Sequence, residues 1–266
     1  MATLRDKIWL WGQIPGGHHN PDFYKLSLIP KENKMTPTEG LAFFGIDKLC
    51  RVKLGREPLY DFMQDPWLGE PAKQICLSLI GAGGAVPKDD MDAILALAKD
   101  DHRFVSAVMD DFYGPERMEA FTPEVLRGYR ERLHNELDRP LELWSVIYER
   151  DLDKPMKSRA VEFDLTTFWT WFGENLPQRD EHIKQLREKF IGDGRLMLGV
   201  YLYDYGGKSI MSDDMMRLQL DYVGEKLASG EIEGAILCSN CVADIGLSTV
   251  PITLEWLDQL DKIECK

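Results

Sequence analysis

The feature that most constrains the fold is a short apolar run that recurs eight times along the chain. Runs of this kind, bounded by turn residues and separated by amphipathic or polar stretches, are typical of buried strands in βαβ units. Parallel strands need such crossovers to connect them, so the alternation predicts an α/β fold with a parallel sheet. The expected strands are Ile8–Ile14, Leu49–Gly55, Ile75–Ile80, Phe104–Met109, Leu141–Tyr148, Leu165–Trp171, Leu196–Tyr203 and Gly234–Ser239.

The number of strands and the chain length favour a closed barrel. Eight strands in 266 residues match the (β/α)8 TIM barrel, and 44% apolar residues suffice for one large core. We therefore expect a single barrel domain over residues 1–266. The connection after the fifth strand is short, so a short or missing helix is expected between strands five and six, around Pro155–Arg159.

Helix starts and stops support this division. Thr36, Pro37 and Glu39 form a capping pattern that predicts a helix over Pro37–Phe44, and Gly45 is a typical C-terminal stop. Thr122 and Pro123 indicate another helix start after the fourth strand. Further helices are expected over Asp89–Lys99, Asp180–Phe190, Asp213–Leu227 and Thr253–Leu260.

The alternative fold is an open, doubly wound sheet with a bound dinucleotide. That fold favours a glycine-rich turn directly after the first strand, and Gly12–Gly17 lacks the spacing, with Pro15 removing an amide. Gly81–Gly84 is not followed by the Lys-Ser/Thr pair of a P-loop and is better explained as a turn. We expect no cofactor.

Charge and composition exclude several classes of function. A net charge of −13 and a pI near 4.9 argue against a nucleic-acid partner, which needs a basic face. No apolar stretch approaches membrane-spanning length and no secretory leader begins the sequence, so we expect a cytoplasmic protein without a membrane partner. Cys238 and Cys241 form a lone C-x-x-C without a second ligand pair, which indicates ordinary reduced thiols and no metal. Oligomeric state is left open.

Polar residues follow the expected strands where a barrel places its active site, at the C-terminal ends. Asp110 and Asp111 end the fourth strand, Glu149 follows the fifth and Asp204 follows the seventh. Strand alternation lets one of the two adjacent aspartates point into the mouth, while the other bonds backbone or a neighbouring helix.

Acids gathered at one opening suit glycoside cleavage. One carboxyl group must stay protonated to donate to the leaving oxygen, and the other must stay ionised. The expected catalytic pair is Asp110 or Asp111 with Asp204, and Glu149 is a third candidate. The structural alternative is that these acids cap helices or pair with Arg51 and Arg150.

Aromatic and polar residues near the same strand ends are candidates for substrate binding, because flat apolar rings can stack on sugar faces. Trp169 and Trp171 can instead pack in the core under the helices. The substrate-binding candidates are Trp11, His18, His19, Arg51, Lys53, Trp169, Trp171, Tyr205 and Asn240.

Two further chemistries remain open. His18 or His19 with Asp110 and Asp204 is a possible metal site, which would suit an isomerase, epimerase or lyase. Lys53 on the second strand could form a Schiff base if a neighbouring cation lowered its pKa. Lys53 and Arg51 could equally bind an anionic substrate.

Five motifs stand out along the chain: MTPTEG at residues 35–40, MDDF at 109–112, FWTW at 168–171, YDYG at 203–206 and GEIEG at 230–234. Their order resembles a group of uncharacterised bacterial (β/α)8-barrel proteins that are themselves similar to glycoside hydrolases. Barrel glycosidases often carry their acids after strands four and seven, where Asp110, Asp111 and Asp204 fall, although many use glutamates there. The resemblance implies a carbohydrate-active barrel enzyme, a hydrolase or glycosidase acting on a small-molecule carbohydrate; the alternatives are a metal-dependent sugar isomerase, epimerase or lyase, or a non-catalytic sugar-binding barrel.

Overall fold

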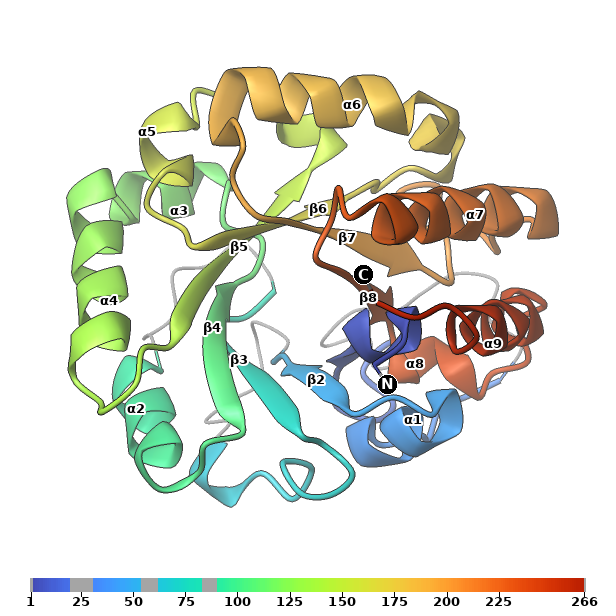
Figure 1. The fold of residues 1–266 in the computed structure, drawn as a ribbon, viewed down its shortest axis with the longest axis horizontal. Helices are drawn as coiled ribbons and strands as arrows, with labels where there is room; N and C mark the ends of the chain where they lie inside the picture. Colours follow the sequence, from blue (N-terminus) through green and yellow to red (C-terminus); the bar gives the residue numbers. More distant parts are fainter. Residues whose placement is uncertain (1, 20–30, 54–61, 83–89, 266) are drawn as a thin grey trace.

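The computed structural model describes residues 2–19, 31–53, 62–82 and 90–265. Its strands form a closed parallel barrel in the order β1 to β8, which confirms the predicted (β/α)8 TIM barrel (Figure 1). Closure comes from β1 pairing with β8, where Trp9 lies opposite Ile236. The strands are β1 Ile8–Gly12, β2 Lys48–Arg51, β3 Gln74–Ile80, β4 Phe104–Met109, β5 Glu142–Tyr148, β6 Leu165–Trp169, β7 Leu196–Tyr201 and β8 Gly234–Cys238.

Helices surround the ring of strands (Figure 1). The helix between β5 and β6 is a single turn, α5 Lys157–Ala160, so the predicted short connection is confirmed. The other α-helices of the described residues are α1 Pro37–Phe44, α2 Met91–Asp100, α3 Pro115–Ala120, α4 Pro123–Asn135, α6 Arg179–Leu186, α7 Asp213–Ser229, α8 Asn240–Ala243 and α9 Thr249–Leu260.

The predicted cap of α1 is present in full. The Thr36 hydroxyl accepts from the Glu39 N–H at 3.2 Å, and the Glu39 carboxylate accepts from the Thr36 N–H at 2.9 Å. Gly45 ends the helix with a left-handed backbone, φ 61°, which glycine adopts without steric cost. These local bonds explain why the bounds of this helix follow from sequence alone.

Several boundaries differ from the sequence predictions. Three predicted strands, beginning at Ile8, Leu165 and Leu196, end two residues earlier than predicted. The sequence analysis missed α3 and α8, which are short. The last helix starts at Thr249 because Pro251 falls in its first turn, where the missing N–H costs nothing. Parts of the predicted second strand and Gly81–Gly84 turn lie outside the described residues.

Large rings fill the barrel interior. Trp9 on β1 meets Trp144 on β5 edge-on, with ring centroids 5.0 Å apart. One layer nearer the mouth, Trp11 meets Trp169 on β6 at 5.2 Å. Gly199 on β7 makes room for this layer, because a Cβ there would lie 1.9 Å from the Trp169 ring. Thus Trp169 packs inside the barrel, and not outward under the helices.

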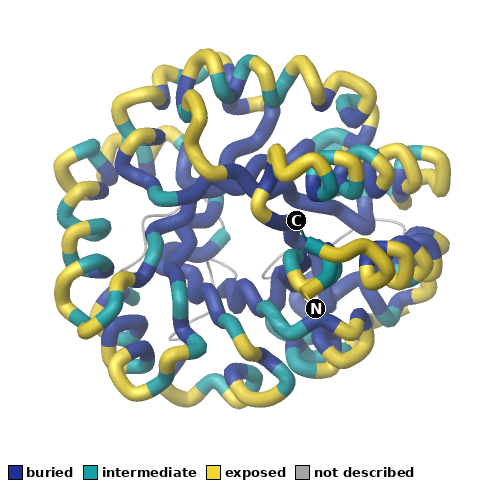
Figure 2. The backbone as a smooth tube through the Cα atoms, in the orientation of Figure 1, coloured by how far each residue is buried: buried dark blue, intermediate teal, exposed yellow. Residues whose placement is uncertain are grey.

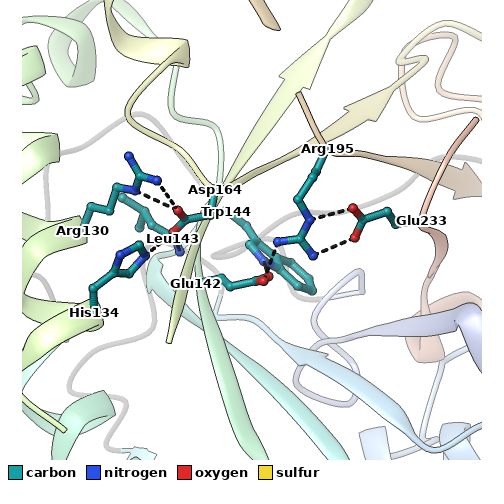
Figure 3. A network of polar contacts seen from close by, with 8 residues as sticks. All are labelled: Arg130, His134, Glu142, Leu143, Trp144, Asp164, Arg195 and Glu233. Atoms are coloured by element: carbon teal, nitrogen blue, oxygen red, sulfur yellow. Dashed lines mark hydrogen bonds and ion pairs between the residues drawn. The ribbon is translucent and has the colours of Figure 1, made fainter. Parts of the chain in front are cut away.

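Ion pairs join the strands at the N-terminal end of the barrel, away from the expected site. Arg195, before β7, bridges Glu142 at the start of β5 and Glu233 before β8 at 2.5 and 2.6 Å (Figure 3). Asp164, before β6, accepts from Arg130 and His134 of α4 at 2.7 and 2.9 Å (Figure 3). These contacts fix helices and strands together at the end opposite the predicted acids.

The strands are buried and the exposed residues lie on the outer helices and loops (Figure 2). The same apolar cluster reaches from the barrel interior to the inner helix faces. Among the described residues, no helix combines the length and the apolar character that crossing a bilayer demands.

Candidate functional site

The register of the barrel determines which residues face the mouth. Asp110 continues the inward positions of β4, because Ser106 lies beside Cys76 and Val108 beside Trp144, whose ring is inside the barrel. On the same parity, Tyr148 ends β5, Tyr201 ends β7 and Cys238 ends β8. One carboxyl, two phenols and a thiol therefore face one opening.

Asp110 is a buried carboxyl group with 3% of its surface exposed. Its Oδ1 accepts a hydrogen bond from the Asp111 N–H at 2.8 Å. Burial raises the pKa of Asp110 well above its ordinary value, and the charge of Asp111 raises this pKa further. The Arg117 guanidinium opposes the shift in part. The net result favours a protonated Asp110, which is the state of a proton donor.

Asp111 departs from strand alternation. Its backbone is left-handed, with φ 46°, a conformation that is uncommon outside glycine. The side chain consequently turns back to the mouth, where Oδ1 accepts from the Tyr148 hydroxyl at 2.9 Å. The two aspartates thus lie together, whereas the sequence analysis expected only one of them to point inward.

Arg117 on α3 holds the end of β4. One of its amino groups donates to the Asp110 carbonyl and the other donates to the Gly81 carbonyl after β3, at 2.8 Å for the second. The side chain is buried, and burial lowers the pKa of Arg117. The guanidinium therefore ties two neighbouring strand ends together directly beneath the acid pair.

Aromatic rings line the mouth beside the acids. Tyr148 and Tyr201 contact each other through their hydroxyls, and burial raises the pKa of both phenols, which keeps them protonated. Trp171 lies 5.4 Å from Tyr148 and 6.0 Å from Tyr201, as ring-centroid distances. Tyr205 packs on Tyr201 at 4.8 Å. The rings offer apolar faces next to two carboxyl groups.

Arg150 lies at the edge of this aromatic cluster. Its guanidinium carbon is 4.4 Å from the Trp171 ring centroid and 4.7 Å from that of Tyr148. The residue is exposed. Tyr148 therefore contacts both groups: its ring lies under the Arg150 guanidinium, and its hydroxyl donates to Asp111.

Glu149 holds a loop. Its two carboxylate oxygens accept from the N–H groups of Trp171 and Phe172 at 2.7 and 3.0 Å, and from the Asn175 amide at 3.1 Å. Glu149 is buried among these donors. Its hydrogen bonds set the position of Trp171 at the mouth.

The Asp204 carboxylate also accepts hydrogen bonds from backbone N–H groups. Its Oδ1 accepts from the N–H groups of Gly173 and Gly207 at 3.0 and 2.8 Å. Its own backbone pairs with Ser209 in a small antiparallel bridge. The residue therefore joins the loop after β6 to the loop after β7.

The two histidines point to different partners. His18 is buried against Tyr205 at a ring distance of 5.5 Å, and burial lowers the pKa of His18 to about 3, with His19 contributing, so its ring is neutral. The His19 ring lies 2.6 Å from the Lys31 carbonyl and accepts from the Asn33 N–H. Over the described ranges, no three His, Cys, Asp or Glu side chains gather as metal ligands.

The two cations expected on the second strand each pair with a carboxylate. Arg51 donates to Asp65 at 2.8 Å and is fully buried. Lys53 contacts Asp90 through its ammonium group. The arrangement gives Lys53 a nearby anion, which stabilises the ammonium form rather than the free amine that Schiff-base chemistry needs.

The remaining predicted site residues are buried in the structure around the mouth. Trp11 and Trp169 belong to the interior layer. Asn240 connects β8 to β1, accepting from the Gln13 N–H at 2.8 Å and donating to the Gln13 carbonyl at 3.0 Å. All five cysteines are free thiols, and burial raises the pKa of Cys238 to about 12.

The sequence analysis did not single out Tyr148, Tyr201 or Arg117. Two of them could have been found from parity: counting by twos along β5 from Trp144 reaches Tyr148, and along β7 from Met197 reaches Tyr201. Arg117 had no such signal, because α3 was not predicted.

The fold and mouth define this chain as a (β/α)8-barrel protein. No family model matches it, and no curated protein matches its sequence. Among solved structures, the apo endo-β-N-acetylglucosaminidase of Cordyceps militaris is similar over 96% of this chain and 89% of its own, at 10% identity and a TM-score of 0.51. A double variant of that enzyme with fucosyl-N-acetylglucosamine-Asn gives the same values.

Two other similar structures are an arabinofuranosidase and a glucanosyltransferase. An arabinofuranosidase aligns over 97% of this chain and 70% of its own, at 11% identity and a TM-score of 0.50. A family 17 β-1,3-glucanosyltransferase from Rhizomucor miehei aligns over 62% of this chain and 64% of its own, at 15% identity and a TM-score of 0.41. At these identities the similarity is one of fold.

Proposed function

We propose that this barrel is a glycoside hydrolase in which Asp110 donates the proton to the leaving oxygen. The observation that carries the proposal is a buried carboxyl group at the barrel mouth whose pKa is raised by burial and by an adjacent carboxylate. A general acid must hold its proton at the working pH, and this environment favours the protonated form.

Asp111 takes the second role in this proposal. The Tyr148 hydroxyl donates to its Oδ1 at 2.9 Å, which holds this carboxylate in place at the mouth. A carboxylate beside the reacting sugar stabilises the positive charge that develops in an oxocarbenium-like transition state. The proposal therefore gives the proton-donor role to Asp110, whose pKa is raised, and the charge-stabilising role to its neighbour Asp111.

The aromatic cluster supports a sugar as the substrate. Trp171 is half-buried and presents ring surface near the acids, with the buried Tyr205 packed against it, and apolar sugar faces stack on such a ring. Solved structures of similar fold include an endo-β-N-acetylglucosaminidase and an arabinofuranosidase. Both points favour the hydrolase over an isomerase that needs a metal.

Asp204 and Glu149 enter the proposal as positioning residues. Asp204 with Asp110 or Asp111 remains the pair predicted from sequence, but its Oδ1 already accepts two backbone N–H groups. Glu149 accepts three donors of the loop that carries Trp171. Both carboxylates are consequently better suited to hold the mouth than to exchange a proton.

The test is a screen of chromogenic glycosides with the parent protein and two variants. Asp110→Asn should lower kcat by at least a hundredfold on any substrate that the parent cleaves, which is within the usual range for loss of a general acid. Asp153→Asn is the matched control, because the Asp153 side chain is 99% exposed and pairs with Lys189 at 3.5 Å on the surface. Equal turnover by Asp110→Asn and the parent would contradict the assignment. Sugar binding without turnover across the screen would favour a non-catalytic barrel instead.

A further inference from the structure

Arg150 differs from the other cations near the mouth in what it contacts. Within the part of the chain that the structure describes, its guanidinium stacks on Trp171 and Tyr148 and has neither an ion pair nor a hydrogen bond. By contrast, Arg51 pairs with Asp65 and Lys53 pairs with Asp90. The two cations that the sequence suggested for an anionic substrate are thus already paired, whereas Arg150 has no carboxylate partner among the described residues.

The Arg150 guanidinium carbon lies over two rings whose planes are 79° apart, so the guanidinium plane can be parallel to at most one of them. A guanidinium that lies over a ring uses its flat face, whereas its five N–H groups point outward in its plane. That edge matches two oxygens of a carboxylate, sulfate or phosphate. The residue is exposed, so a ligand can reach it without displacing the core.

The position of Arg150 ties it to the acid pair. Tyr148 donates to Asp111 on one side and carries the Arg150 guanidinium 4.7 Å from its ring centroid on the other. Trp171, the second ring under Arg150, is held by Glu149 through its backbone N–H at 2.7 Å. A sugar that stacks beside Trp171 therefore has Asp111 and Arg150 on two sides of one small aromatic cluster.

We propose that Arg150 recognises an anionic substituent, so that the mouth prefers acidic sugars to neutral ones. The inference rests on the proposed function insofar as the ligand is a sugar, but it concerns binding and not proton transfer. The chain as a whole carries a net charge of −13, which repels anions at long range, so a local cation with directed N–H groups is needed to select one.

The experiment measures sugar binding to the full chain by tryptophan fluorescence, because Trp171 lies beside the proposed contact. The probes are D-glucuronate, D-glucose 6-sulfate, D-glucose 6-phosphate and D-glucose, so the three anions distinguish which group is preferred. The variants are Arg150→Gln, which removes the charge, and Arg150→Lys, which keeps the charge without the fork. Arg217→Gln is the control, since Arg217 is exposed on α7 and pairs loosely with Glu255 at 3.8 Å.

We expect at least one acidic sugar to bind the parent about tenfold more tightly than glucose, as a charge-assisted pair provides. Arg150→Gln should remove this preference, Arg150→Lys should retain part of it, and Arg217→Gln should leave it unchanged. Equal affinity for glucose and all three anions in the parent overturns the proposal, as does a preference that survives in Arg150→Gln. Turnover separates the two hypotheses: an Arg150-dependent preference without glycoside cleavage supports this site and counts against the hydrolase, whereas cleavage without any anion preference does the reverse.

Discussion

The Tyr148 hydroxyl donates a hydrogen bond of 2.9 Å to Oδ1 of Asp111, and so joins the end of β5 to a residue two positions beyond the end of β4. Asp111 has a left-handed backbone that costs a non-glycine residue about 1–2 kcal/mol. This hydrogen bond fixes the Asp111 carboxylate at the mouth, where the left-handed backbone has directed it. It also brings the charge of Asp111 close enough to raise the pKa of Asp110.

The first prediction concerns this hydrogen bond. Tyr148→Phe should destabilise the fold by about 1–3 kcal/mol, because the part-buried Asp111 carboxylate loses a donor. The free energy of unfolding in urea measures the effect. Tyr222→Phe is the control: its hydroxyl donates to Asp180 at 2.8 Å on the outer surface, where water replaces the bond and the loss should stay below about 1 kcal/mol. Equal losses in the two variants would show that the Asp111 contact has no special importance.

The second prediction concerns the pH dependence of activity. Asp111→Asn removes a negative charge that raises the pKa of Asp110, so this pKa should fall. If Asp110 is the general acid, the alkaline limb of the kcat/KM profile reports its deprotonation. This limb should move to lower pH in Asp111→Asn and stay in place in Asp153→Asn. An alkaline limb unmoved by the loss of Asp111 would separate Asp110 from the acid role.

The third prediction links the same carboxyl to stability. The pKa of Asp110 in the fold is raised above the unfolded value of about 3.9, so the folded chain binds more protons between those two values. Stability must then fall as pH rises through that window and remain lower above it. Asp110→Asn removes the penalty and should be more stable than the parent at pH 7, by about 1–3 kcal/mol.

The difference in unfolding free energy between Asp110→Asn and the parent is measured by urea denaturation at a series of pH values from about 3.5 to about 8. The gain should shrink toward the acid end, where the parent Asp110 is protonated in both states. A variant that is less stable than the parent at every pH would mean that the ionised carboxylate is favoured in the fold, contrary to the proposed acid role.

The barrel itself was predictable because its signals are local. Apolar runs gave the strands, and Thr36 with Glu39 gave the start of α1, since both depend on neighbours within four residues. The roles of the acids were not local. Asp110 and Asp111 are adjacent, and only the positive φ of Asp111 brings both to the mouth. No sequence pattern predicts a positive φ at an aspartate in this position.

Glu149 and Asp204 show a second reason why the roles of the acids could not be predicted from the sequence. Each stands at the end of a strand, as a catalytic acid would, yet each accepts N–H groups of the loop after β6. Their partners are 22 and 31 residues away, and the donors are backbone groups that every residue has. Composition therefore cannot distinguish a loop-holding carboxylate from a reacting one, while the folded chain separates them by their donors.

The fourth prediction tests that distinction at Glu149. Glu149→Gln replaces an acceptor of three hydrogen bonds by an amide that has only one acceptor oxygen, leaving a buried N–H of Trp171 or Phe172 without its partner. The unfolding free energy should fall by about 1–3 kcal/mol. Glu181→Gln on the exposed face of α6 should change it by less than about 0.5 kcal/mol. Normal stability with turnover abolished in Glu149→Gln would instead return this residue to the list of catalytic acids.

The fifth prediction concerns the layer of rings beneath the site. A Cβ added at Gly199 would lie 1.9 Å from Trp169 Cε3, closer than any real contact, and the ring is confined on its other side by Trp11. Gly199→Ala should therefore cost about 3 kcal/mol or more through overpacking. Gly128→Ala in α4 is the matched control, because nothing lies within 4 Å of its Cβ position and alanine should stabilise the helix by about 0.5–1 kcal/mol.

A double variant identifies the cause of the Gly199→Ala loss. Trp169→Leu removes the ring that the new methyl group would meet, at the cost of a cavity. If overpacking is the cause, Gly199→Ala should cost much less in the Trp169→Leu background than in the parent, so the two changes should be strongly non-additive in urea denaturation. Additive losses would mean that Gly199 is needed for the backbone conformation of β7 and not to make room for the Trp169 ring. In that case the ring layer would not be what limits the size of residue 199.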